Sequence, residues 1–353
     1  MTGQSHLLRR GRALLVNWPF IVETSVCAVK PLTFALLRRL SDGTFHSGEE
    51  MARELGISRA TVSNALAEIK DWDVDLARIS GRGYRLERPI EWIDAARLAE
   101  AFPELNPEVF DVVDSTNTVC FRGADEGRAH RRLVVAELQT GGRGRRGRVW
   151  RATLGGSLLF SVLWRFDQPA VALSGLSLAV GVALSRALKA AGIAGAALKW
   201  PNDVLYQYRK LAGILIELQG DALGPTTAVI GIGLNVRLSA RTRDAIDQAV
   251  IDLATIVGHV PSRNALLHQV LRHLGAVLRE FEANGFGGLR EEWLAEHAYQ
   301  GKPVRLVLPG GDVLPGRVEG ITEDGALLLL RGRELLRVNA GEMTLRAATD
   351  ASR

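Results

Sequence analysis

The chain has 353 residues, of which 47% are hydrophobic, so it is too long for one average domain and too apolar for a disordered chain. Forty-four lysines and arginines against 39 acidic residues give a mild net charge of +5. Two cysteines, Cys27 and Cys120, exclude a disulfide-stapled scaffold and fit a reducing cytoplasm, while the seven scattered histidines argue against a protein-ligated metal.

The first 30 residues show no clear structural pattern. Several arginines precede an apolar stretch from Ala13 to Val22, which Asn17 and Pro19 interrupt. A signal peptide needs an uninterrupted apolar run and a cleavage site with small residues. We therefore interpret residues 1–30 as an extension without an assigned function. Elsewhere no apolar run approaches the roughly 20 residues of a membrane helix, so we expect no membrane association.

The next segment has the pattern of a winged helix-turn-helix. Apolar residues recur at helical spacing from Leu32 to Leu40, and a second short helix is predicted from Ser47 to Leu55. Gly56 follows at a tight turn, and Ser58 occupies the N-cap position of a third helix. A hairpin with Arg82 at its tip comes next and forms the predicted wing.

This order of elements predicts a recognition helix for the major groove of DNA. The candidate DNA-contacting residues are Ser58, Arg59, Thr61, Ser63, Asn64 and Arg82. We expect the two arginines to contact phosphates and the polar side chains of the third helix to read base edges. The alternative is a small helical packing module with a solvated charged face. The turn glycine, the serine cap and the wing together favour DNA binding.

A loop rich in glycine and arginine is the predicted chemical centre. A strand predicted from Leu133 to Leu138 runs into it, and five arginines without an acid lie between Gly141 and Arg151. Three of its glycines match G-x-G-x-x-G, but that motif must open a helix, whereas Gly155–Trp164 has the pattern of another strand. We therefore reject a dinucleotide-binding fold.

Glycines let the backbone approach a ligand, and arginines supply paired donors for anionic oxygens. The loop therefore predicts a site that brings two anions together, such as a carboxylate and a triphosphate. An RNA-binding or merely solvated basic loop is the alternative. The position of the loop after a buried-type strand, with Trp150 at its end, argues against that alternative.

Several motifs together resemble the family of bifunctional biotin–protein ligases and biotin-operon repressors. They are Asp114-Ser-Thr-Asn117, the string GRGRRGRVW from Gly142 to Trp150, Lys199-Trp-Pro-Asn-Asp203, Lys210-Leu-Ala-Gly-Ile-Leu-Ile-Glu217 and Gly231-Ile-Gly-Leu-Asn235. The resemblance covers about residues 31 to 353. It implies that biotin is activated with ATP to biotinyl-5′-adenylate and transferred to one lysine of a carrier domain, typically that of acetyl-CoA carboxylase.

The resemblance also implies a role for each matching residue. Biotin would be bound by Ser115, Thr116, Asn117, Gln139, Gly142, Arg143, Gly144, Arg145 and Lys199. ATP would be contacted by Arg145, Arg148, Trp150, Asn202 and Asn235. Lys199 and Arg143 are the expected catalytic residues, with the Lys199 ammonium between the attacking carboxylate and the α-phosphate. Asp203 is the candidate for the group that deprotonates the acceptor lysine, and Mg²⁺ is implied by the triphosphate.

The rest of the chain supplies the scaffold. Apolar residues repeat at helical spacing over residues 173–188 and 266–281, and short strands separated by glycine turns fill the last fifty residues. We expect an unassigned extension at 1–30, a winged helix-turn-helix at 31–88, a catalytic domain at 89–300 and an SH3-like β-barrel at 301–353. The catalytic domain is expected to be α/β or α+β, of the biotin/lipoyl ligase type.

The resemblance further implies partners and a location. The partners are a biotin carboxyl carrier protein and operator DNA, which a homodimer would bind. The location is the cytoplasm, and the regulatory role is biotin-responsive repression of biotin synthesis genes. The alternatives are a ligase without repressor activity, a lipoate-type ligase of related architecture, and a biotin-sensing regulator without catalysis. The arginine-rich loop argues against a lipoate ligase, and the loop together with Lys199 argues against a mere sensor.

Overall fold

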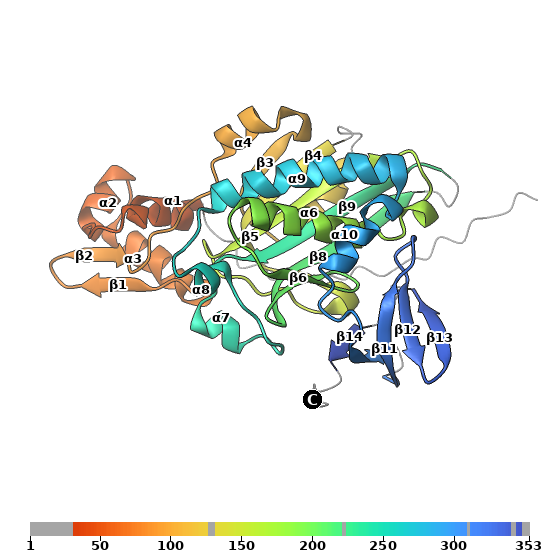
Figure 1. Ribbon diagram of the computed structural model, residues 1–353. Helices are drawn as coiled ribbons and strands as arrows, with labels where there is room; N and C mark the ends of the chain where they lie inside the picture. The colour runs from red at the N-terminus through yellow and green to blue at the C-terminus, as the bar shows by residue number, and fades with distance from the viewer. Residues whose placement is uncertain (1–30, 126–130, 221–223, 309–310, 340–343, 348–353) are drawn as a thin grey trace, which may run out of the picture.

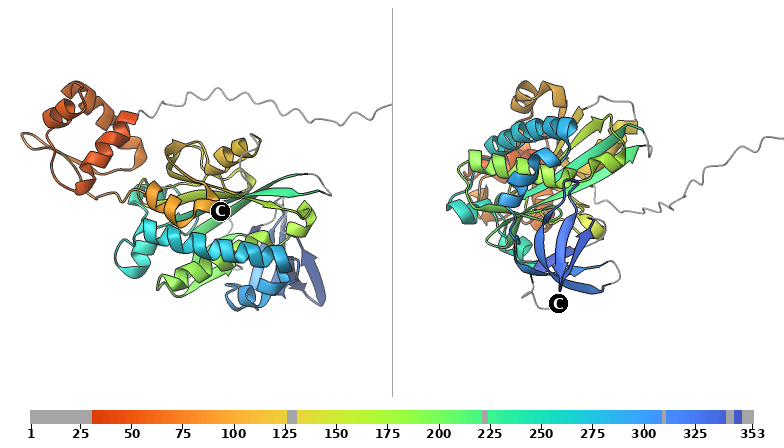
Figure 2. Two further views of the ribbon diagram at one scale, coloured as in Figure 1. Left: turned by 90° about the horizontal axis from the view of Figure 1, so that it is seen from above. Right: turned by 45° about the vertical axis from the view of Figure 1, so that its right-hand side comes forward.

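The computed structural model describes residues 31–125, 131–220, 224–308, 311–339 and 344–347 (Figure 1). The extension at 1–30, left unassigned by the sequence, lies outside the described residues. Three units follow one another along the chain. A small helical unit with a two-stranded ribbon lies at one end, a seven-stranded sheet with helices in the centre, and a second sheet near the C-terminus (Figures 1 and 2).

The N-terminal unit has the predicted winged helix-turn-helix elements. They are α1 (Pro31–Arg39), η1 (Leu40–Asp42), α2 (Gly48–Glu54), α3 (Arg59–Ala67), η2 (Glu68–Trp72), β1 (Leu76–Ile79) and β2 (Gly83–Leu86). The predicted cap is confirmed, because Ser58 Oγ accepts a hydrogen bond from the Thr61 amide at 3.0 Å. Gly83 begins β2 where a Cβ atom would lie 2.0 Å from the carbonyl oxygen of His46, so only glycine fits there.

The central unit is built on one mixed sheet. Its strands are β3 (Pro107–Val113), β4 (Arg131–Gln139), β5 (Ser157–Phe166), β6 (Ala196–Lys199), β7 (Asp203–Tyr206), β8 (Arg209–Gly220) and β9 (Thr226–Asn235). They lie in the order β3-β4-β5-β9-β8-β7-β6, and only β3 and β4 run parallel. The mostly antiparallel pairing gives the α+β form of the expected fold class.

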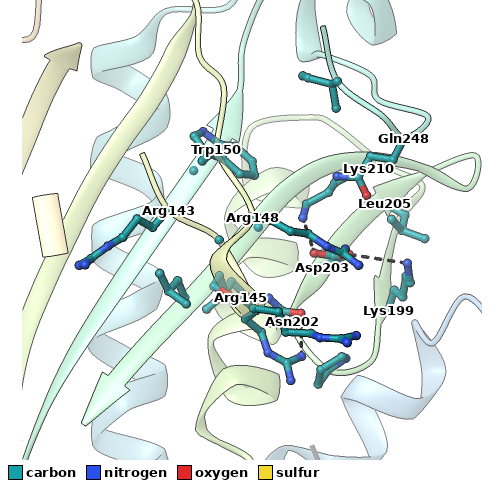
Figure 3. Close-up of a pocket in the computed structure, with 18 of the residues that line it drawn as sticks. Arg143, Arg145, Arg148, Trp150, Lys199, Asn202, Asp203, Leu205, Lys210 and Gln248 are labelled. Carbon is teal, nitrogen blue, oxygen red and sulfur yellow. Dashed lines mark hydrogen bonds and ion pairs between the residues drawn. The ribbon is translucent and has the colours of Figure 1, made fainter. Parts of the chain in front are cut away.

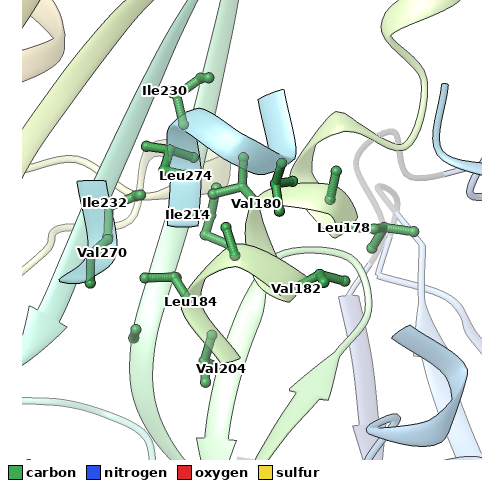
Figure 4. Close-up of a cluster of buried hydrophobic side chains, with 14 of the residues drawn as sticks. Leu178, Val180, Val182, Leu184, Val204, Ile214, Ile230, Ile232, Val270 and Leu274 are labelled. Atoms are coloured by element: carbon green, nitrogen blue, oxygen red, sulfur yellow. The ribbon is translucent and has the colours of Figure 1, made fainter. Parts of the chain in front are cut away.

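Helices complete the central unit. They are α4 (Ala95–Ala101), η3 (Pro103–Leu105), α5 (Thr116–Asp125), η4 (Arg145–Gly147), η5 (Ala170–Leu173), α6 (Leu176–Ala190), α7 (Ala240–Asp244), α8 (Leu253–Val257), α9 (Arg263–Asn284), η6 (Gly287–Leu289) and α10 (Arg290–Ala295). The two helices predicted from apolar spacing are α6 and α9, which lie side by side on one face of the sheet (Figures 1 and 2). Their apolar side chains meet those of β8 and β9, such as Ile214 and Ile232, in the main core (Figure 4).

One stretch, Ala170–Ala190, is long and apolar enough to cross a membrane, contrary to the sequence expectation. It consists of η5 and α6, and 67% of its most apolar window is buried inside the protein. Its apolar residues face α9 and the sheet, as those of a core helix do. Length and composition alone are therefore weak grounds for a membrane span here.

Hydrogen bonds position the central unit relative to the segments that lead to its neighbours. The segment before α4 is anchored where the fully buried Glu137 accepts hydrogen bonds from the Ile93 amide and from Arg263, each at 2.7 Å. On the other side, the indole of Trp200 donates to the carbonyl oxygen of Gly325 at 3.1 Å.

The C-terminal unit is a small antiparallel sheet. Its strands are β10 (Pro303–Val307), β11 (Val313–Ile321), β12 (Leu327–Arg331), β13 (Glu334–Val338) and β14 (Thr344–Ala347), in the order β13-β12-β11-β10-β14. Four of these strands match the expected short strands of the SH3-like domain. The fifth, β14, was not predicted, and it pairs with β10.

Candidate active site

A cavity of about 1120 Å³ opens where the central and C-terminal units meet. Its walls come from the β3–α5 junction, the arginine–glycine loop, the β6–β7 turn, strands β8 and β9, residues 245–249 and the start and end of the C-terminal sheet. Segments that are far apart in the sequence therefore share one space. Figure 3 shows the cationic part of the cavity.

Glycines shape the floor of the cavity. Gly213 on β8 and Gly233 on β9 are paired across the sheet, and the Trp150 ring lies directly on both. A Cβ atom on Gly213 would lie 2.8 Å from this ring, and one on Gly233 would lie 2.4 Å from it. Only glycine at these positions lets the ring reach the sheet. The Trp150 Nε1–H is buried without a hydrogen-bond partner among the described residues.

One end of the cavity is lined mainly by neutral polar side chains. Ser115 directly precedes α5, and Thr116 and Asn117 begin it. All three are buried and line the cavity with Gln139. The Gln139 side-chain oxygen accepts from the Thr116 amide at 2.8 Å. These four predicted residues therefore do come together, with their amide and hydroxyl groups already oriented.

Two residues that sequence reasoning missed orient the Asn117 amide. Ser161 Oγ on β5 lies 2.6 Å from the Asn117 oxygen, and the Asn117 nitrogen donates to Glu217 on β8 at 2.6 Å. Glu217 ends one of the quoted motifs, which was a usable signal. Ser161 had none, because a single serine in an apolar strand indicates no partner before the sheet is assembled.

The other end of the cavity is cationic. Asp203 begins β7, with the Lys210 ammonium 2.7 Å and the Lys199 ammonium 3.7 Å from its carboxylate oxygens (Figure 3). All three side chains are less than 18% exposed. Burial alone would raise the pKa of Asp203, but the two ammonium groups outweigh it and hold the pKa below its usual value. Lys210 was absent from the predicted site residues, although it begins a quoted motif.

The arginine–glycine loop covers this cationic end. The loop is a hairpin in which the Gly144 amide donates to the carbonyl oxygen of Arg148 at 2.7 Å. Arg145 donates to the side chain of Asn202 at 3.3 Å, and burial lowers the pKa of its guanidinium. Arg148 points toward Asp203, whereas Arg143 points to the opposite side (Figure 3).

Arg143 is held away from the other cations by hydrogen bonds. Its guanidinium donates to Thr118 at 3.2 Å and to Glu217 at 3.4 Å. It still lines the cavity, as do Gly144, Arg145, Arg148, Trp150, Lys199 and Asn202. A catalytic role for Arg143 would require its side chain to leave Glu217.

Two predicted site residues are not among the described residues that line the cavity. Gly142 lies behind the wall, where its carbonyl oxygen accepts from the Trp150 amide at 2.8 Å. Asn235 is buried at the end of β9 and donates to the carbonyl oxygen of Ile251 at 3.1 Å. Gly142 therefore closes the loop, and Asn235 holds the segment that follows residues 245–249.

The predicted DNA-contacting residues lie on a separate surface. Arg59, Thr61 and Asn64 are exposed on α3, and Ser63 is half-buried. The Ser58 and Thr61 hydroxyls lie 2.8 Å apart, so each is already engaged in the cap. On the wing, the Arg82 guanidinium lies over the Phe45 ring, 5.1 Å from its centroid.

The described part of the chain contains no group of three or more His, Cys, Asp and Glu side chains placed to hold a metal ion. Cys120, the one cysteine among the described residues, is buried, and burial raises the pKa of its thiol to about 12. It is therefore not a reactive thiol at neutral pH.

Family models match each of the three units. A model of the biotin/lipoate A/B protein ligase family matches residues 109–235, an HTH domain matches 33–85, and a biotin protein ligase C-terminal domain matches 299–346. These matches define the class of the protein: a biotin/lipoate-type protein ligase that carries a helix-turn-helix domain.

Whole-chain relatives narrow this class. The bifunctional ligase/repressor BirA of Salmonella typhimurium is 37% identical over 90% of this chain and 98% of its own length, and that of Escherichia coli is 34% identical over 89% and 97%. The chain belongs to this bifunctional ligase/repressor family. A solved structure, the biotin protein ligase from Aquifex aeolicus in complex with biotin and ATP, is 30% identical and aligns with a TM-score of 0.59 over 69% of this chain and 99% of its own.

Proposed function

We propose that the chain is an ATP-dependent biotin–protein ligase that also represses transcription in response to biotin. One observation carries the proposal: a single cavity joins an end of oriented amides and hydroxyls to an end with two buried ammonium groups. Biotin has a matching form, because its ureido head is uncharged and its other end is a carboxylate. Under this proposal Ser115, Asn117 and Gln139 contact the head.

In the first step a biotin carboxylate oxygen attacks the α-phosphorus of ATP, and the bond to pyrophosphate breaks. The two reactants are anions that repel each other in water. Lys199, Lys210 and Arg145 offset this repulsion in a partly dehydrated cavity, where charges act more strongly. The product is the mixed anhydride biotinyl-5′-adenylate, which the arginine–glycine loop shelters from water.

In the second step a neutral lysine amine of the carrier domain of acetyl-CoA carboxylase attacks the carbonyl carbon, and AMP leaves. The lowered pKa of Asp203 makes its carboxylate a weak base. We therefore assign Asp203 to holding the two ammonium groups in place rather than to deprotonating the acceptor. Mg²⁺ enters as the companion of the triphosphate, whose oxygens are ligands that this ion prefers.

The helix-turn-helix unit supports the repressor part of the proposal. Its α3 helix presents Arg59, Thr61 and Asn64 to solvent, as a recognition helix does. We propose that a homodimer binds a twofold operator in the cytoplasm, because a twofold protein fits a palindromic site. The carrier protein and the operator DNA then compete for the same adenylate-loaded protein. We propose no membrane partner.

Incubation with ATP, labelled biotin and an isolated carrier domain tests the ligase. The expected result is label on one carrier lysine, dependent on ATP. Adenylate formation without label on the carrier would contradict the transfer step, and biotin binding without adenylate would leave only a biotin-sensing regulator. A gel shift with operator DNA, with and without biotin and ATP, tests the repressor, and unchanged mobility would leave a ligase alone.

A further inference from the structure

The end of the helix-turn-helix unit is hydrogen-bonded to a short helix beside the ligase cavity. Asp73 lies between η2 and the wing, and its Oδ2 accepts hydrogen bonds from Ser239 Oγ and, at 2.7 Å, from Thr242 Oγ1. Arg241 of the same helix donates to the carbonyl oxygen of Lys70 at 2.8 Å. Helix α7 and its cap thus hold the segment that joins the recognition helix to the wing.

Asp73 acts on the start of α7 through its capping residue. Ser239 is the N-cap of α7, and its Oγ accepts from the Thr242 amide at 2.9 Å. Because the hydroxyl hydrogen of Ser239 is engaged by Asp73, its lone pairs are directed to the helix. Thr242 is 7% exposed, so its hydrogen bond to Asp73 is shielded from water.

Residues 245–249 follow α7 directly and line the cavity. Most of this loop is exposed, so few buried contacts of its own hold it. Its far end is fixed to β8, where the Lys210 amide donates to the carbonyl oxygen of Ala249 at 2.9 Å. The loop therefore lies at the cationic end of the cavity, with Gln248 close to Lys210 (Figure 3), and its near end takes its position from α7.

Helix α7 has anchors of two origins. Within the ligase, Arg243 donates to Asp252 at 2.8 Å, and the Thr153 hydroxyl accepts from the Ser239 amide and donates to Thr242 Oγ1, each at 3.2 Å. The other anchors, Asp73 and the carbonyl oxygen of Lys70, belong to the helix-turn-helix unit. Loss of the Asp73 contacts would therefore leave the start of α7 held from the ligase side alone.

We infer that Asp73, a residue of the helix-turn-helix unit, is a positioning residue for the cationic end of the ligase cavity, where ATP binds. It acts through Ser239 and Thr242 on α7 and thereby on residues 245–249. The inference rests on the proposed function, since the nucleotide is the ATP of the ligase reaction. It links the DNA-reading unit to the ligase within one chain, without a second subunit.

Matched variants distinguish the effect of the Asp73 carboxylate from the effect of the backbone conformation at this position. Asp73 has φ 62°, in the left-handed region, so Asp73→Gly removes the side chain without adding backbone strain. Asp73→Asn keeps an oxygen that can accept both hydroxyl hydrogens. Thr242→Val removes the hydroxyl that donates to Asp73 at nearly constant shape, and with it the acceptor of the Thr153 hydroxyl. Steady-state kinetics of adenylate formation by the full chain would give kcat and the KM for each substrate.

The expected result is a KM for ATP raised roughly fivefold or more in Asp73→Gly and in Thr242→Val. The KM for biotin and kcat should stay close to wild type, and Asp73→Asn should recover most of the loss. Because the hydrogen bond between Thr242 and Asp73 is already absent in Asp73→Gly, the effects of the two changes on the KM for ATP should add up to less than their sum in the double variant. An unchanged KM for ATP, or an equal rise for both substrates, would overturn the inference.

A second measurement does not depend on activity. Hydrogen exchange of the peptide that contains residues 245–249 should be faster in Asp73→Gly than in wild type, with Asp73→Asn in between. Equal exchange in all three proteins would also overturn the inference. If the wild-type chain formed no adenylate at all, the proposed function would fail, and this exchange experiment would still decide the role of Asp73.

Discussion

The most informative residues are three charged side chains from the neighbouring strands β6, β7 and β8. Lys199 and Lys210 come from different strands, and the carboxylate of Asp203 lies between them. The carboxylate neutralises part of the charge of the two lysines in a cavity that is partly closed to water. When the two anionic substrates bind, their negative charges neutralise the remaining positive charge of the two ammonium groups.

Lys199→Ala should lower adenylate formation by about a hundredfold or more, because it removes a cation that stabilises charge at the α-phosphate. The measurement is pyrophosphate release with saturating biotin and ATP, and the melting temperature should stay near that of wild type. Lys189→Ala, which removes an exposed lysine of α6, is the control and should be neutral. Normal turnover of Lys199→Ala would refute the assignment of this residue.

At the scale of elements, the arginine–glycine loop combines closure with strain. Its ends are tied by the hydrogen bond between the Trp150 amide and Gly142. Its tip holds Arg146 at φ 61°, a conformation that residues with side chains rarely adopt. A loop that is closed at its base and strained at its tip is suited to change conformation around a ligand.

Biotin and ATP together should therefore protect the loop from trypsin, which cleaves after arginine. The readout is the rate of cleavage between Arg143 and Arg151, followed by mass spectrometry. Cleavage after Arg82 in the wing provides an internal control, since that site lies outside the cavity. Equal cleavage of the loop with and without the two substrates would contradict the proposed ordering.

A second element, the edge strand β6, is covered by residues 296–298. Leu198 donates to the carbonyl oxygen of Glu296 at 2.8 Å and accepts from the Ala298 amide at 2.9 Å. Between them lies His297, which is 7% exposed and packs on Trp293 at 4.4 Å between ring centroids. This cover pairs the edge of the sheet that would otherwise be open.

His297 should make stability depend on pH. Burial lowers its pKa to about 4, against roughly 6.5 for an unfolded histidine. Between these values the unfolded chain binds more protons, so stability is highest above about pH 6.5 and falls as the pH drops toward 4. Urea unfolding near pH 7 and near pH 5 should show a loss of roughly 1–2 kcal/mol from this group.

The matching test of this pH dependence replaces the ring. His297→Gln should reduce the difference in stability between the two pH values, whereas replacement of the exposed His259 by Gln should leave it unchanged. The same difference in His297→Gln as in wild type would assign the pH dependence to other groups.

At the scale of the whole molecule, the DNA-reading surface and the ligase cavity lie on different units. The units touch where Trp92 donates to Ser41 at 2.8 Å and where Asp73 meets α7. Arg59 lies on the exposed side of α3 and is not among the described residues that line the cavity. A change there should therefore affect DNA binding alone.

Arg59→Ala should weaken operator binding for all sequences and reduce the slope of log affinity against log salt by about one unit, as expected for the loss of one phosphate contact. Gel shifts at several salt concentrations measure this slope. Carrier labelling by the same variant should match wild type. Arg272→Ala on α9 serves as the control, and unaltered operator affinity of Arg59→Ala would remove it from the interface.

Local sequence patterns predicted much of the fold and part of the site. Helical spacing predicted α6 and α9, glycine and serine signals predicted the helix-turn-helix, and motifs predicted the cavity residues Ser115 and Lys199. Each of these signals lies within a few neighbouring residues, where propensity and spacing act. The site roles themselves remain predictions.

Other features were decided only by the tertiary structure. Ser161 becomes a partner of Asn117 only when β5 lies beside α5, and Arg143 is drawn to Glu217 only across the assembled sheet. Asp73 meets Thr242 across 169 residues of chain. The chain alone determined which chemical groups were present and where helices and strands would form. Their pairing depended on long-range packing, because contacts between distant segments leave no local periodicity in the sequence.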